Sequence, residues 1–150
     1  MDAVRYEERL WPPAWMWIVA GFVALGLGVA YGFPLGLWWG ALAFAVVGVG
    51  LAWLLVGSAV RIRVGREGLS AGRALLPPTA IGPATPLDPE AAEALRGPGA
   101  DARAHLVLRG WIRTAVRVDV ADPADPTPYW YVSSRRPEQL AAALAEVRSP

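Results

Sequence analysis

Residues 10–60 read LWPPAWMWIVAGFVALGLGVAYGFPLGLWWGALAFAVVGVGLAWLLVGSAV, and this run of 51 residues contains no charged residue and no histidine. A bilayer core of about 30 Å is crossed by about 20 apolar helical residues. The run is therefore too long for one span and suits two spans joined by a tight turn. The sequence predicts a helical hairpin in a membrane.

Prolines and glycines divide this run into two helices. Pro12 and Pro13 suit the first turn of a helix, where a missing N–H costs nothing. Pro34 stands between Gly32 and Gly36 and marks the turn. The run is also longer than the apolar region of a cleaved signal peptide, so we expect both helices to persist. The predicted spans and the turn cover residues 14–33, 37–59 and 34–36.

The charges on either side of the run predict its orientation. Arginines precede the first span and follow the second, while the connecting turn carries no charge. Positive residues favour the cytoplasmic side, so we expect a two-pass protein of the inner (plasma) membrane with both termini in the cytoplasm. Residues 1–13 are then a cytoplasmic juxtamembrane segment, and residues 60–150 form a cytoplasmic domain. The flanking arginines are Arg5, Arg9, Arg61, Arg63 and Arg66.

Small residues lie along one face of each predicted span, and they let helix backbones approach closely. These faces either meet within the hairpin or leave one face for a second membrane protein or a second copy of the chain. Neither span contains an ionisable group, the usual marker of a transporter or an ion path. The small residues are Ala14, Gly21, Ala24, Gly28 and Gly32 in the first span, and Ala41, Ala45, Gly48, Ala52 and Ala59 in the second.

The composition limits the chemistry of the remaining residues. The net charge of +1 argues against nucleic acid as a partner. Without cysteine there is no disulfide, thiolate nucleophile or cysteine metal site, and a single histidine cannot support a zinc site. We therefore expect no metal and no cofactor.

The sequence pattern of residues 60–150 predicts one small α+β domain. Val60, Ile62 and Val64 alternate with arginines before a tight turn at 65–68. The alternation of apolar and polar residues at 112–120 is the clearest strand pattern in the chain. We expect an antiparallel sheet or partly open barrel that a C-terminal helix closes. The other predicted elements are a strand that begins at Leu69, strands at 104–109 and 129–133, a helix that Asp88 caps and Gly97 stops, and a helix at 137–148.

Two motifs resemble a known family. One is YEERLWPP at 6–13, and the other runs from RTAVRV at 113–118 through DPTPYW at 125–130 to SSRRPEQL at 133–140. Together they resemble an uncharacterised group of actinobacterial two-helix membrane proteins, domain of unknown function 3093, which implies no activity. More loosely, the second motif is similar to the end of bacterial pleckstrin-homology-like domains. That resemblance implies a small sheet barrel capped by the last helix.

The same resemblance suggests a headgroup site at Arg61, Arg63 and Arg73. Pleckstrin-homology domains bind phosphoinositides through basic residues on their first two strands. Here the turn at 65–68 is too tight to surround a headgroup, and Glu67 places a negative charge where phosphate would lie. The alternative is that these arginines face water or anionic lipid beside the membrane.

Enzyme and cation motifs in the domain are weak. The stretch GLSAG at 68–72 matches G-x-S-x-G, and Ser70, Asp88 and His105 occur in the order of a hydrolase triad. The motif needs a strand, a sharp turn and a helix in a large sheet, so we expect no enzyme and place His105 on an exposed strand. Three aspartates with a spacing of three could bind a hard cation, but Asp-Pro pairs favour turns. These aspartates are Asp119, Asp122 and Asp125.

A candidate partner surface combines arginines with aromatic residues, the residue types that dominate protein interfaces. It consists of Arg113, Arg117, Tyr129, Trp130 and Tyr131. The alternative is that Trp130 belongs to the core and that the arginines only pair with the aspartates.

These patterns favour a non-enzymatic, membrane-anchored adaptor or scaffold that presents its domain to a protein partner. The alternative is a lipid-headgroup-sensing accessory subunit of an envelope or membrane enzyme complex. In both cases the lipid bilayer is a partner of the chain.

Overall fold

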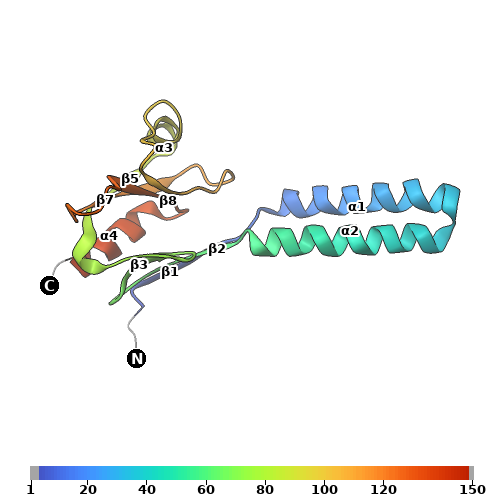
Figure 1. Ribbon diagram of the computed structural model, residues 1–150, viewed down its shortest axis with the longest axis horizontal. Coiled ribbons are helices and arrows are strands. Elements are labelled where there is room, and N and C mark those ends of the chain that lie inside the picture. Colours follow the sequence, from blue (N-terminus) through green and yellow to red (C-terminus); the bar gives the residue numbers. More distant parts are fainter. Residues whose placement is uncertain (1–3, 149–150) are drawn as a thin grey trace. The chain divides into compact units, whose positions relative to one another are not determined.

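The computed structural model describes residues 4–148 and divides the chain into two compact units (Figure 1). One unit, the apolar hairpin, is Trp11–Val60. The other, the α+β domain, combines Met1–Leu10 with Arg61–Pro150. The domain is therefore assembled from both sides of the hairpin in the sequence.

The hairpin consists of helices α1 (Ala14–Leu35) and α2 (Leu37–Gly57). Both helices are long and apolar enough to cross a membrane, as the sequence predicted. The connection is shorter than the predicted turn, because α1 continues through Pro34 in its last turn. Gly36 alone reverses the chain, with a φ of 101° that residues with a side chain rarely adopt.

Glycines bring α1 and α2 into close contact. Ala24 and Gly28 are the buried residues of α1, as the predicted small-residue face requires. In α2, Gly40 is the buried residue, whereas Ala41 and Ala45 of the predicted small-residue face are exposed, so that face meets α1 only in part. A Cβ atom at Gly40 would lie 2.6 Å from the carbonyl oxygen of Gly28. The helices therefore approach at a point that admits no side chain.

The first sheet of the domain, sheet A, has the strand order β1-β2-β3-β4. Its first strand was not predicted, because Glu7 and Glu8 gave residues 6–10 the composition of a juxtamembrane segment. In the structure these residues alternate between buried and exposed positions, as in a strand with one face on a core. The strands are β1 (Tyr6–Leu10), β2 (Val60–Gly65), β3 (Gly68–Ala71) and β4 (Ala74–Leu76).

The second sheet, sheet B, has the order β5-β7-β8-β6. Strands β5, β7 and β8 pair antiparallel, whereas β6 runs parallel to β8. Pro83 and Pro86 concealed β5 in the sequence, but an edge strand tolerates proline. β7 begins three residues later than predicted, because Ile112 lies in the preceding loop. The strands are β5 (Ile81–Leu87), β6 (His105–Val107), β7 (Ala115–Val120) and β8 (Tyr129–Ser133).

Helices cover both faces of sheet B. Helix α4 (Pro137–Arg148) contacts both sheets and lies between them within the domain (Figure 1). Helix α3 (Pro89–Arg96) lies on the opposite face of sheet B, and the side chain of Asp88 caps its first turn. A single 3-10 turn, η1 (Pro78–Ala80), precedes β5. The chain thus has two long apolar helices, antiparallel and mixed sheets, and a C-terminal helix.

Candidate functional site

The outer face of sheet A collects exposed arginines. Ile62 and Val64 of β2 point into the core, so Arg61 and Arg63 point away from it. We call this side the arginine face. It comprises Arg9, Arg61 and Arg63 on the strands, with Arg66 and Arg73 in the turns after β2 and β3.

A glutamate from β1 lies between two of these arginines. A carboxylate oxygen of Glu7 is 3.4 Å from Arg61 Nε and 3.3 Å from an Arg63 terminal nitrogen. All three side chains are exposed, so water screens the pairs and each contributes little to stability. The pairs place one carboxylate beside two of the exposed guanidinium groups.

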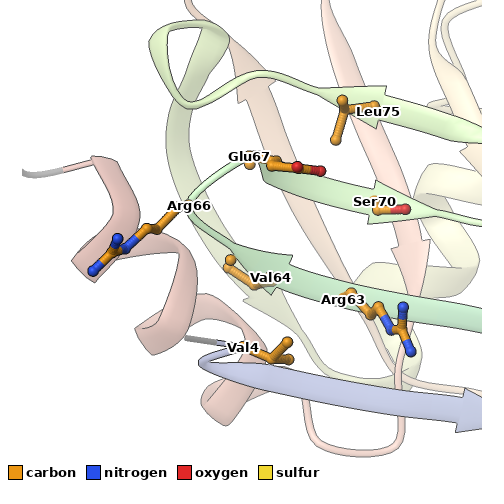
Figure 2. Close-up of a pocket in the computed structure, with 9 residues that line it drawn as sticks. Val4, Arg63, Val64, Arg66, Glu67, Ser70 and Leu75 are labelled. Atoms are coloured by element: carbon orange, nitrogen blue, oxygen red, sulfur yellow. The ribbon is translucent and has the colours of Figure 1, made fainter. Parts of the chain in front are cut away.

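A pocket of about 270 Å³ opens on the arginine face, shown in Figure 2. Its floor is set by strand register, because Ser70 is opposite Arg63 on β2 and opposite Leu75 on β4. Directly opposed residues point to the same side of a sheet, so these three side chains are neighbours. Leu75 is 52% exposed, and Val4 at the rim is 51% exposed. The pocket therefore combines cations with accessible apolar surface.

The other ingredients of the hydrolase motif lie on different elements from Ser70. Ser70 is on β3 of sheet A, Asp88 caps α3, and His105 is on β6 of sheet B. The expectation of an exposed His105 was wrong, since its ring is partly buried and lies 4.2 Å from the ring of Trp130. Ser70 and His105 thus lie in different sheets, and Ser70 is on a strand and not at the strand-to-helix turn that the motif needs.

A buried carboxylate, which sequence reasoning missed, joins the two ends of the domain. Glu8 on β1 is only 5% exposed. Its oxygens accept hydrogen bonds from Tyr6 Oη at 2.7 Å, Ser134 Oγ at 2.6 Å and the Arg135 amide at 3.0 Å. We call these four residues the Glu8 cluster. Every donor reaches the carboxylate at hydrogen-bonding distance, so the cost of its burial is offset.

The Glu8 cluster also positions the start of α4. Ser134 Oγ accepts a hydrogen bond from the Arg136 amide at 3.0 Å, next to the first turn of the helix. The guanidinium of Arg136 lies 5.7 Å from the centre of the Tyr6 ring. Burial is the main cause that raises the pKa of Tyr6 to about 12. β1 is therefore attached to α4 through a buried polar contact.

A family model described as "Protein of unknown function (DUF3093)" matches residues 5–144. The chain belongs to this family. The matched range contains both sequence motifs, and the Glu8 cluster joins one to the other. No curated protein and no solved structure matches the chain.

In this family member the aromatic part of the predicted partner surface is interior. Tyr129, Trp130 and Tyr131 are 4%, 6% and 0% exposed, so that prediction was wrong for all three. The reason is that β8 pairs on both edges and is covered on both faces. The alternative that Trp130 belongs to the core is the one observed.

The two arginines of that surface are separated in the structure. Arg117 Nε donates to Asp119 Oδ1 at 2.8 Å, and its guanidinium lies 4.5 Å from the centre of the Tyr129 ring. Arg113 is exposed in the loop before β7, where it lines a hollow of about 580 Å³ with Arg96 of α3. Only Arg113 is therefore placed to meet a partner in the way the sequence suggested.

The remaining aspartates act as turn residues. Asp122 Oδ1 accepts from the Ala124 amide at 2.9 Å, and Asp125 Oδ1 accepts from the Thr127 amide at 2.8 Å. These bonds confirm the turn interpretation. Within residues 4–148 no group of three or more His, Cys, Asp or Glu side chains is arranged to hold a metal ion.

Proposed function

We propose that this family member is a two-pass membrane protein with a non-enzymatic adaptor domain. The pairing of both ends of the hairpin in one sheet carries this proposal. β1 precedes α1, β2 follows α2, and the two strands are neighbours in sheet A. Strands of one sheet lie on the same side of a bilayer, so the hairpin begins and ends on that side. The flanking arginines make it the cytoplasmic side of the inner membrane.

The architecture of the domain supports the adaptor role. Two sheets closed by a C-terminal helix agree with a pleckstrin-homology-like plan, which presents surfaces rather than a deep cleft. The accessible hollow around Arg96 and Arg113 is our candidate surface for a protein partner, because arginine is enriched in interface hot spots.

The topology is tested by labelling single cysteines, since the chain contains none. A cysteine at Leu37, which is 80% exposed, should react with an impermeant reagent in intact cells. Leu37 is preferable to Gly36, whose positive φ a cysteine would strain. A cysteine at the exposed Thr79 should react only after the cells are permeabilised. Labelling of Thr79→Cys in intact cells would overturn the proposed orientation.

The adaptor role is tested by purification from native membranes. Arg96→Ala plus Arg113→Ala should remove a co-purifying protein that the wild-type chain retains. Arg103→Ala is the matched control, because Arg103 is exposed but occupied by Asp101 at 3.0 Å. If both variants retain the same partners as wild type, the hollow is not the adaptor surface.

A second candidate is an accessory subunit that senses lipid headgroups. The arginine face favours this candidate, because it includes Arg61, Arg63 and Arg73, all of which are exposed.

A further inference from the structure

Charge is divided unevenly over the domain. Outside the apolar run, residues 4–76 contain six arginines and three glutamates, and one of those glutamates is the buried Glu8. Residues 77–134 contain five arginines and seven acidic residues. Sheet A therefore presents positive charge, whereas sheet B and its loops are negative.

Exposed apolar side chains gather on the same positive face. In the described part of the domain, residues 4–10 and 61–148, three large hydrophobic side chains are exposed: Val4, Leu75 and Leu106. Two of them, Val4 and Leu75, line the pocket on the arginine face, beside Arg63 and Arg66. Arginine next to exposed aliphatic surface is the combination that binds at a bilayer interface, where headgroups meet cations and acyl chains meet apolar groups.

The chain connects sheet A to the apolar helices by short segments. Three residues separate β1 from α1, and two residues separate α2 from β2. Such links hold sheet A at a high effective concentration beside any bilayer that the hairpin crosses. A weak surface attraction then suffices, since each arginine near an anionic leaflet favours docking by roughly fivefold.

We infer that the arginine face docks on the anionic phospholipid surface of the membrane that anchors the chain, with Leu75 in the headgroup layer. The inference rests on the proposed membrane anchoring and gives a ligand class to its second candidate. Recognition is by surface charge, not by one headgroup, because Glu67 lines the same pocket as Arg63 and Arg66 and repels a phosphate that enters it. Docking therefore depends on the fraction of anionic lipid and weakens with salt.

The test uses the full chain with one cysteine, Leu75→Cys, labelled with an environment-sensitive fluorophore. The protein is reconstituted in vesicles of phosphatidylcholine, or of phosphatidylcholine with roughly one-third phosphatidylglycerol. We expect a blue shift and quenching by headgroup nitroxide lipid in the anionic vesicles only. Leu106→Cys is the matched control, because it is an exposed leucine on sheet B and should not respond.

Charge variants separate docking from simple tethering. Arg66→Gln plus Arg73→Gln should reduce the Leu75 response severalfold, whereas Arg103→Gln, at an exposed arginine already paired with Asp101, should leave it unchanged. A response that is equal in neutral and anionic vesicles, or absent from both, overturns the inference. A further outcome is that, in native membranes, the cysteine of Leu75→Cys is protected from thiol reagents in a way that requires the arginines. If this protection occurs without a fluorescence response in vesicles that hold no other protein, the face binds a protein and the inference is overturned. Resistance of the same samples to carbonate extraction reports the anchoring separately.

Discussion

At the scale of single residues, Glu8 is a charged residue that the fold buries and surrounds with donors. A carboxylate that is 5% exposed is tolerated because three donors reach it, two from side chains and one from the backbone. Two of those donors come from residues 134 and 135, so the bonds attach β1 to the segment that begins α4. Glu7, one position earlier, is exposed and only pairs with arginines at the surface.

Glu8→Ala should therefore destabilise the domain far more than Glu7→Ala. Removal of the buried carboxylate breaks the three hydrogen bonds from Tyr6, Ser134 and Arg135 and leaves the hydroxyls of Tyr6 and Ser134 only their mutual 3.3 Å contact in which to donate, which costs about 3 kcal/mol in total. Loss of the exposed pairs of Glu7 costs at most about 1 kcal/mol. Denaturant unfolding of the purified protein, followed by circular dichroism, measures both. Equal losses in the two variants would show that the Glu8 cluster does not hold β1 in place.

Tyr6 predicts how stability depends on alkaline pH. Burial raises its pKa from 10.0 to about 12, so the folded domain keeps a proton that the unfolded chain has lost between these values. The contribution of Tyr6 is complete below pH 10 and is lost as the pH rises towards about 12.

The alkaline loss should be smaller in Tyr6→Phe than in wild type. Melting temperatures measured at steps across this range compare the two. Tyr31→Phe in the hairpin is the control and should retain the wild-type slope. Burial also raises the pKa of Tyr131, so this residue contributes the same alkaline loss of stability in both proteins. If the melting temperatures of Tyr6→Phe and wild type decline in parallel, the assignment to Tyr6 is contradicted.

At the scale of elements, the sequence predicted those strands and helices whose structure depends on neighbouring residues in the chain. The strand at 129–133 and the helix at 137–148 were predicted with the observed bounds, and the Asp88 cap is present. β1 and β5 were missed because glutamates and prolines contradict strand propensity, and pairing with distant strands decides their structure. The arginines of sheet A were identified from strand alternation, whereas the interior position of Tyr129 and Tyr131 depends on α3, which covers them.

Gly40 gives a test of the hairpin as an element. A Cβ atom there would meet the Gly28 oxygen at 2.6 Å and the Gly32 Cα at 2.7 Å, and both are backbone atoms that cannot rotate away. Gly40→Leu should force the helices apart and destabilise the hairpin by about 1–3 kcal/mol, the usual range for overpacking.

The matched control is Gly50→Leu, because nothing lies within 4 Å of a Cβ atom at Gly50. Resistance to proteolysis in detergent micelles compares the three proteins, and only Gly40→Leu should be cut faster within the hairpin. Equal resistance of both variants would contradict the close approach of the helices.

At the scale of the whole molecule, the domain is not continuous in the sequence. The sequence patterns predicted three consecutive segments, 1–13, 14–59 and 60–150. The structure instead places residues 6–10 in sheet A, where the Arg5 amide donates to the Val64 oxygen at 2.9 Å. Local sequence cannot reveal such a pairing, because its partners are separated by the whole hairpin.

The domain should fold without the hairpin provided that β1 is retained. β1 and β2 are hydrogen-bonded neighbours, and Glu7 pairs with Arg61 and Arg63 across them, so a Gly-rich loop of about four residues can replace residues 11–59. We expect this chain to be soluble and to melt cooperatively. Removal of residues 1–10 from it should abolish the cooperative transition, because the Tyr6 and Leu10 side chains leave the core and Ser134 loses its carboxylate partner. Calorimetry of the two chains measures this difference. A cooperative transition of unchanged enthalpy in the shorter chain would show that β1 is an accessory to the domain, and the shared sheet would then no longer support the proposal that both ends of the hairpin lie on one side of a membrane.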